Sequence, residues 1–433
     1  MPDEPTEGPS MKKITKNLML LAALSFLITT GSQNLQSTNQ HSYWMKISAH
    51  DKFERSILAN DGIAIEIVQD NYVIAYGGDR ELNKMKNRGL LLASSDLQIE
   101  NNYRRNLINA KDFPSKDSAY HNYQELSEAL KDLTAKNSDL VKMTSIAQTT
   151  EKRDMWALEI TNDPNNASQK PAIIFMGGHH AREHLSVEMP LMWAQYLITQ
   201  FRAGNSRVVN LLNSRVIHII PTVNPDGMEY DIASTNYQMW RKNRSKNSDG
   251  TYGVDLNRNY GYQWGTGGSS SNTSDDTYKG TQPFSEIEST AIKNYVEAHS
   301  NITILLTYHS FSKLILYPWG HKYANLEITK DFAVHKTMAE KMATWNGYTP
   351  EQSSALYIAS GDTTDWSYGA HKIISFTFEL DPANSGFGGG GFYPGTAQIQ
   401  PSFDKNIEPM MYLSEYADNP YRVLNVGIGP INP

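Results

Sequence analysis

The sequence contains no cysteine among its 433 residues. Thiolate nucleophiles, thiolate metal ligands and disulfide bonds are therefore excluded, and any metal site must use histidine and carboxylate side chains. The sequence also has no surplus of positive charge. Lys and Arg number 39 against 46 Asp and Glu, the net charge is −7, and no basic run interrupts the chain. This charge balance predicts that nucleic acid is not a partner.

No apolar run is long enough to cross a membrane. The longest follows three lysines in MKKITKNLMLLAALSFLITTGSQ, and its apolar part at 18–30 falls short of the ~20 residues that span a bilayer. A basic start, a short apolar core and small residues after it are typical of a secretory signal peptide. We therefore expect 1–33 to be an N-terminal extension and signal peptide. The mature protein is expected to be secreted, extracellular or periplasmic, without stable membrane association.

The chain is too long for one ordinary domain, and its first structured block is small. Residues 43–95 alternate between strand and helix patterns in the order β-α-β-β-α-β, which is the ferredoxin-like arrangement. A polar linker with Arg104 and Arg105 follows, a candidate site for proteolysis between about Arg105 and Asp112. The expected divisions are a propeptide at 34–111 and a catalytic domain at 112–433.

From about Met155 onward, short apolar and β-branched segments alternate with helical patterns. The expected strands are 155–160, 171–176, 215–221, 303–309 and 373–380. Their apolar character is continuous rather than alternating, which indicates strands covered on both faces in a mainly parallel α/β sheet. Ligand sites in such sheets lie beyond the carboxyl ends of the strands.

Chemically active side chains follow three of these strands. The stretch GGHHAREH at 177–184 comes directly after one strand, while His309 and Glu379 end two others. Each could be an ordinary hydrogen-bonded residue when taken alone. Because a buried unpaired charge costs several kcal/mol, three such residues at three buried strand ends favour a common site.

Two metal-binding spacings compete within GGHHAREH. His180, Glu183 and His184 spell H-x-x-E-H, the inverzincin signature, which requires both histidines inside one helix. However, His180 comes just after the glycine pair at 177–178 that follows the strand, with only His179 between, so it is expected in the turn or at the helix edge. We expect the helix to begin near residue 181 and to run to 201 with a kink at its proline. We therefore favour His180 and Glu183 with His309 as a third ligand, since two histidines and one glutamate form a catalytic zinc arrangement. The inverzincin reading remains an alternative, and His179 is expected to be a neighbour.

Six motifs follow one another along the chain: H-A-R-E (180–183), YQMWRKNRS (237–245), GVDLNRNYG (253–261), LTYHSFSKLILYPWG (306–320), YIASGDTTDWSYG (357–369) and FTFEL (376–380). In these motifs and in their order the chain resembles the M14 zinc metallocarboxypeptidases over about 113–418, most of all the secreted bacterial carboxypeptidase T-like branch. The resemblance implies an α/β fold with a mixed eight-stranded sheet between helices. It also implies a zymogen in which a small α+β ferredoxin-like prosegment, here 43–95, covers the cleft.

The resemblance further implies one Zn²⁺ per chain on His180, Glu183 and His309. Asp255 would fix a ligating imidazole, a role that metal sites commonly require. Glu379 would be the catalytic glutamate that takes and passes on a proton.

Further roles follow from the same resemblance. Arg244 would stabilise the oxyanion, while Asn257 and Arg258 would hold the terminal carboxylate of the substrate. Tyr357 would close over that carboxylate. Arg182 and Ser310 match substrate contacts that lie further out.

Two residues bear on specificity. Thr364 falls where relatives carry an apolar or acidic residue at the pocket floor, and Asp362 could add negative charge there. We expect apolar C-terminal residues to be removed, with basic ones also accepted. Calcium at SKNSDG (245–250) stays open as a weak alternative to a solvated turn.

These observations predict a monomeric zinc carboxypeptidase that acts on peptide or protein C-termini after cleavage by an activating protease. One alternative is a cell-wall peptide amidase or peptidase of the same fold, which hydrolysis of muropeptides alone would favour. The other is a catalytically inactive binding module, which is disfavoured because metal ligands, base and carboxylate clamp are all present.

Overall fold

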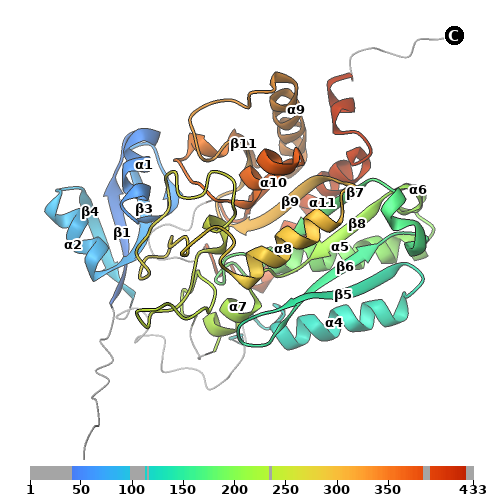
Figure 1. Cartoon of the computed structure of the whole chain (residues 1–433), viewed down its shortest axis with the longest axis horizontal. Helices are drawn as coiled ribbons and strands as arrows, with labels where there is room; N and C mark the ends of the chain where they lie inside the picture. Colours follow the sequence, from blue (N-terminus) through green and yellow to red (C-terminus); the bar gives the residue numbers. More distant parts are fainter. Residues whose placement is uncertain (1–40, 98–112, 115–116, 234–236, 384–390, 426–433) are drawn as a thin grey trace, which may run out of the picture. The chain divides into compact units, whose positions relative to one another are not determined.

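The computed structural model describes residues 41–97, 113–114, 117–233, 237–383 and 391–425. The predicted signal peptide and the predicted cleavage site lie outside these described residues. The helices and strands are labelled in Figure 1. Among the described residues, no helix combines the length and the hydrophobicity that a membrane span requires.

A small four-stranded antiparallel sheet with two helices comes first along the chain. Its elements are β1 (Ser42–Ser48), α1 (Lys52–Asn60), β2 (Ala64–Val68), β3 (Tyr72–Gly78), α2 (Asp79–Asn87) and β4 (Leu91–Asp96). The strand order is β2-β3-β1-β4, so the predicted ferredoxin-like arrangement is present. Alternate residues of β1 face opposite sides: Met45 and Ile47 pack against the helices, while Trp44 packs on the other face. Helix α1 begins after Asp51, whose carboxylate accepts two backbone N–H groups at 2.8 Å.

The larger sheet has eight strands in the order β11-β10-β12-β9-β7-β8-β6-β5. The strands are β5 (Val141–Gln148), β6 (Asp154–Ile160), β7 (Ala172–Met176), β8 (Val216–Ile220), β9 (Ile302–Ser310), β10 (Leu314–Tyr317), β11 (Thr349–Gln352) and β12 (Ile374–Leu380). Strands β12, β9, β7 and β8 are parallel neighbours, and antiparallel pairs flank them, which confirms the predicted mixed sheet. The five strands expected from the sequence are present. The strands β5, β10 and β11 were not expected.

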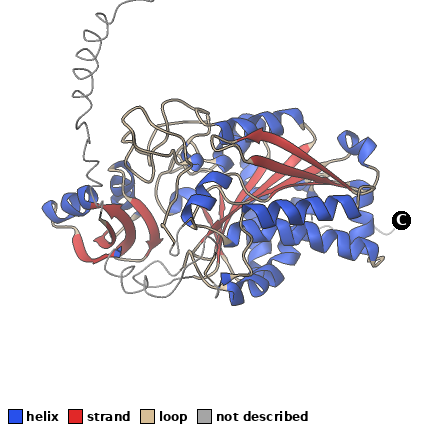
Figure 2. Cartoon of the chain, turned by 90° about the horizontal axis from the view of Figure 1, so that it is seen from below, coloured by secondary structure: helices blue, strands red, loops and turns tan. Residues whose placement is uncertain are grey.

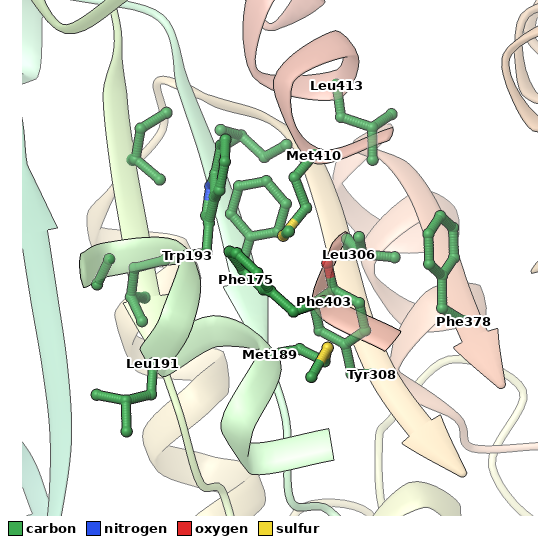
Figure 3. Close-up of a cluster of buried hydrophobic side chains, with 14 of the residues drawn as sticks. Phe175, Met189, Leu191, Trp193, Leu306, Tyr308, Phe378, Phe403, Met410 and Leu413 are labelled. Atoms are coloured by element: carbon green, nitrogen blue, oxygen red, sulfur yellow. The ribbon is translucent and has the colours of Figure 1, made fainter. Parts of the chain in front are cut away.

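Helices cover both faces of this sheet, as Figure 2 shows. They are α4 (Tyr123–Lys136), α5 (Leu185–Arg202), α6 (Ser206–Ser214), α7 (Pro225–Asp231), α8 (Ile287–Ala298), α9 (Thr329–Asn346), α10 (Thr363–His371) and α11 (Ile399–Tyr416). Side chains of α5 and α11 meet strand residues in the main core, where Trp193, Met189 and Phe403 lie around Phe175 and Tyr308 (Figure 3). A second core on the other face includes side chains of α8 and Trp366 of α10. Burial on both faces explains the continuous apolar strands.

One predicted boundary was wrong, and it affects the site. The helix expected at 181–201 begins only at Leu185, so Glu183 precedes it. Tight turns occupy the interval because the Ser186 hydroxyl donates to the Glu183 carbonyl at 2.6 Å and accepts from the Gly178 N–H at 2.9 Å. Glycine is required before these turns: a Cβ on Gly177 would lie 2.0 Å from the Ser186 carbonyl oxygen.

Candidate metal centre and substrate pocket

Three predicted metal ligands meet at the carboxyl ends of β7 and β9. The Nδ1 atom of His180 lies 2.7 Å from one Glu183 carboxylate oxygen, and Nδ1 of His309 lies 3.0 Å from the other. The two Nδ1 atoms are 3.1 Å apart. All three side chains are buried. His309 lies far from His180 and Glu183 in the sequence. The sheet brings them together, because β7 and β9 are parallel neighbours whose carboxyl ends lie at the same edge.

This grouping fits a metal ion. Two imidazole nitrogens that face one another at 3.1 Å need a proton or a cation between them, and an adjacent carboxylate supplies negative charge. Burial would raise the pKa of Glu183, but the charges of His180 and His309 hold it below its usual range. Two histidines and one glutamate form a donor set that zinc uses in catalytic sites.

The competing H-x-x-E-H spacing does not converge. His184 lies at the start of α5, and its Nε2 pairs with Asp231 at 2.9 Å, away from the cluster. His179 is occupied as well, since its ring nitrogens lie 2.9 Å from the Tyr260 hydroxyl and 3.1 Å from the Thr307 hydroxyl. Neither histidine belongs to the three-residue grouping.

Asp255 lies behind the cluster, as expected. Its Oδ1 atom is 3.3 Å from Nε2 of His180, the ring nitrogen opposite the cluster, and its Oδ2 atom accepts from Nε of Arg241 at 3.0 Å. Burial opposes ionisation, but Arg241 and then His180 hold the pKa of Asp255 well below its usual range. The carboxylate can therefore orient the imidazole of His180.

A pocket of about 390 Å³ opens beside the cluster. It is lined by His180, Glu183, His309, Arg241, Asn257, Arg258, Ser310, Tyr357, Asp362, Thr364, Glu351 and Glu379, among others. Glu379 reaches it because β12 and β9 run parallel in register and pair Glu379 with His309. Burial and the negative charge of Glu183 raise the pKa of Glu379 well above its ordinary value.

Asn257 and Arg258 are oriented by the fold at one side of this pocket. The Arg258 guanidinium donates to the carbonyls of Gly268 at 3.0 Å and Asn257 at 2.8 Å, and it lines the pocket. The Asn257 side-chain oxygen accepts from the backbone N–H of Thr363 at 3.0 Å. A guanidinium held in this way can bind a carboxylate through two parallel hydrogen bonds.

The structure does not bring Arg244 to the pocket, contrary to the sequence-based expectation. Its guanidinium stacks on the Tyr230 ring at 3.6 Å and lies near Glu151. Arg241, three residues earlier, lines the pocket instead, with Nη1 3.9 Å from Glu183. The W-R-K-N-R motif contains two arginines, and the sequence-based prediction chose the second. Arg241, which directly follows Trp240, was the other candidate in the same motif.

Arg182 is not a lining residue of the pocket; it pairs with the small N-terminal sheet. Its fully buried guanidinium binds Glu66 of β2 and, at 3.0 Å, Asp276. Glu66 itself lines the pocket. Glu66 was not among the site residues predicted from the sequence, although a single charged residue within the apolar run IAIEIV could have indicated it.

The two predicted specificity residues lie together in the pocket wall. Asp362 caps the N-terminus of α10, and its carboxylate accepts from the backbone N–H of Asp365 at 2.8 Å and from the Thr364 hydroxyl at 2.7 Å. Its second oxygen is buried and has no hydrogen-bond partner among the described residues. Burial, and then the charge of Asp365, raises the pKa of Asp362 to about 7.

The geometry of the turn at 245–250 does not support a calcium site there. Asp249 of the SKNSDG turn accepts hydrogen bonds from the backbone and hydroxyl of Thr251 at 3.0 and 2.6 Å. In the described part of the chain it belongs to neither grouping of metal-ligating side chains. Its geometry is that of a hydrogen-bonded turn.

Comparisons with known proteins agree with this geometry. The profile of a family described as zinc carboxypeptidase matches residues 126–409. A zinc carboxypeptidase of Saccharothrix mutabilis subsp. capreolus is 37% identical over 328 residues, covering 73% of this chain and 74% of that protein. Carboxypeptidase A2 of Mus musculus is 32% identical over 70% of this chain and 72% of that protein. The solved structure of carboxypeptidase A from Helicoverpa armigera shares the fold, with a TM-score of 0.70 at 23% identity over 87% of this chain and 97% of that chain.

Proposed function

This chain belongs to the zinc carboxypeptidase family, and from that premise we propose that it releases the C-terminal residue of peptides through the pocket described above. The observation that carries the proposal is the meeting of His180, Glu183 and His309 beside Glu379 and Arg258 in one pocket. A zinc ion held by the first three would supply Lewis-acid activation of water and of the scissile carbonyl.

The protein side chains then have distinct tasks. Arg258 and Asn257 bind the terminal carboxylate, which fixes the last peptide bond near the cluster. Glu379 removes a proton from the attacking water and passes it to the leaving amine. Arg241 takes the role first expected of Arg244, because its buried guanidinium is placed to stabilise negative charge on the scissile oxygen.

The test compares blocked dipeptides that end in a free carboxylate with the same peptides as amides, using cleaved and zinc-loaded protein. We expect the amide to lose at least about tenfold in kcat/KM, because a hydrogen bond to a charged group contributes about 1.5–3 kcal/mol. Chelation should abolish hydrolysis, and Zn²⁺ should restore it. Equal hydrolysis of the amide would contradict the carboxylate clamp, and full activity of metal-free protein would contradict the metal centre.

The same substrates test specificity for apolar and basic residues. We propose that Asp362 admits a C-terminal lysine, supported by its buried oxygen without a partner in the described structure. A pKa of about 7 leaves the carboxyl neutral at pH 6 and ionised at pH 8, so attraction for lysine grows as pH rises. The lysine-to-leucine ratio of kcat/KM should increase by up to about tenfold over this interval. Asp362→Asn, which keeps a helix-capping side chain, should remove the increase.

We also propose that the protein is exported as an inactive precursor. Support comes from the small four-stranded unit at 41–97, here called the N-terminal domain, whose residues Ile65, Glu66 and Gln69 line the pocket. The Arg55 guanidinium donates to the carbonyls of Leu356 at 2.6 Å and Ala355 at 3.1 Å. These carbonyls directly precede Tyr357, the residue predicted to close over the substrate carboxylate. The Tyr357 hydroxyl itself contacts the Ile65 carbonyl at 3.4 Å. A peptide substrate could not occupy this space while the domain stays bound.

Limited proteolysis of the intact chain between about Arg105 and Asp112 is therefore expected to raise peptide hydrolysis by at least about 100-fold. Glu66→Gln should raise the activity of the uncleaved chain, because breaking a buried charge pair weakens an interface by about 2–5 kcal/mol. Glu54→Gln is the matched control, an exposed acid of the same domain. Full hydrolysis before cleavage would refute the precursor while leaving the carboxypeptidase intact. N-terminal sequencing of exported protein would locate the processing sites.

A further inference from the structure

A second cluster of metal-ligating side chains lies away from the pocket. It consists of Glu159 on β6, His218 on β8 and His299 just after α8, and one potential ligand atom of each lies within 4.8 Å of the others. None of the three lines the substrate pocket.

The sheet and α8 bring these residues together. Antiparallel pairing of β6 and β8 sets Glu159 directly opposite His218, and side chains so paired share one face. That face is the one covered by α8, because Val216 and Ile220, two residues either side of His218, pack in the core that contains Ile292 and Val296 of α8. The end of α8 then delivers His299, whose ring centroid lies 4.8 Å from that of His218.

The hydrogen bonds of the two histidines are compatible with a free lone pair on each Nε2: for His299 a carbonyl fixes the tautomer, and for His218 the Tyr295 hydroxyl can accept from Nδ1. Nδ1 of His299 lies 2.7 Å from the Tyr295 carbonyl oxygen, which can only accept, so the proton sits on Nδ1 and Nε2 is free to bind a metal. Metal-binding histidines commonly make this outer contact to a carbonyl. Nδ1 of His218 lies 2.9 Å from the Tyr295 hydroxyl.

One polar atom of the cluster is buried and unsatisfied. His218 is fully buried, and its Nε2 has no hydrogen-bond partner in the described structure. A buried polar atom without a partner destabilises the fold, because it has lost its hydrogen bonds to water. No hydrogen bond or ion pair joins the Glu159 carboxylate to any described residue, although the ring nitrogens are near. A cation between these groups would satisfy all of them.

We propose that Glu159, His218 and His299 form a second divalent transition-metal site, of the zinc type, that fastens β6 and β8 to the end of α8. Two imidazoles and one carboxylate suit zinc and its neighbours better than magnesium or calcium, which prefer oxygen ligands. Glu159 and His299 are partly exposed, so the ion can enter from solvent and keep a water as a further ligand. Its role is to stabilise the fold, since a ligand that binds only the native state raises its stability.

To test this, zinc is removed from the full chain by chelation and dialysis and is then added back. Elemental analysis measures the number of zinc ions bound per chain, and calorimetric titration measures the affinity of each site. Wild-type protein should hold two Zn²⁺ per chain, and His309→Ala should hold one. Glu159→Gln and His299→Gln should each weaken the second site by more than about 100-fold and leave the first unchanged, a larger loss than outer-contact substitutions give. Glu297→Gln, an exposed acid on α8, is the matched control.

Thermal unfolding gives an independent measure. In the His309→Ala background, added Zn²⁺ should raise Tm, and the further substitution Glu159→Gln should abolish that rise. A single zinc equivalent in the wild type would overturn the proposal. So would a second equivalent, or a Tm shift, that persists unchanged in both Glu159→Gln and His299→Gln.

Discussion

Glu379→Gln is expected to lower kcat by about 10²–10⁴-fold, the usual contribution of a positioned general base, while the protein keeps its zinc. An amide has nearly the shape of the carboxylate but cannot accept the proton from water. Glu379 lines the pocket without belonging to the metal grouping, so its substitution should leave zinc stoichiometry unchanged. Steady-state kinetics and elemental analysis on the same preparation provide the measurement.

Glu351→Gln is the matched control for this experiment. Glu351 is another carboxylate of the pocket lining, carried by β11, and burial also raises its pKa. Loss of a generic negative charge would affect both variants alike, whereas loss of the base affects only Glu379→Gln. If Glu379→Gln stayed within threefold of the wild type, the proposed proton transfer would be wrong.

The second large effect separates two arginines that lie three residues apart. Arg241→Gln should lower kcat by about 10²–10³-fold, because removing one donor to the developing oxyanion typically costs that much. Arg244→Gln should change kcat less than about threefold. It should lower stability by no more than about 1–2 kcal/mol, since the guanidinium stacks on Tyr230 outside the pocket.

Folding has to be controlled in this comparison, because Arg241 also pairs with buried Asp255 at 3.0 Å. Arg241→Lys keeps the positive charge but lacks the planar fork, so it should retain the fold and zinc while still losing activity. Tm and zinc content of each variant identify general disruption. A defect of equal size in Arg244→Gln would restore the original assignment from the sequence.

Much of the fold was predictable because the strands are buried on both faces. Mostly apolar runs such as PAIIFM and IISFTFEL would expose apolar side chains to water if one face of the strand were solvated. These two runs form the buried strands β7 and β12. The strands that were missed lie at or near the sheet edges. TPEQ in β11 contains a proline and three polar residues, so pairing with β10 rather than its own composition makes it a strand.

The exact start of α5 was not predictable from local spacing. The pattern of His180, Glu183 and His184 is compatible with one helix. Hydrogen bonds of the Ser186 hydroxyl, together with backbone bonds such as Glu183 N–H to the His180 carbonyl, hold the segment in turns until Leu185. That difference decides the ligand set. In a helix both histidines would share a face, whereas the turns direct His184 to Asp231.

The sequence by itself determined which chemistry was available: a chain without cysteine, with histidine and glutamate at the ends of apolar strands, can build a metal site only from imidazole and carboxylate. Only the tertiary structure decided which side chains share that site. Arg241 and Arg244 are alike in type and setting along the chain, but one faces Glu183 and the other an aromatic ring. Tertiary packing also decided the neighbours of two further glutamates. Glu66 pairs with Arg182, 116 residues away, and the pairing of β6 with β8 sets Glu159 opposite His218, 59 residues away. Spacing along the chain encodes neither neighbour.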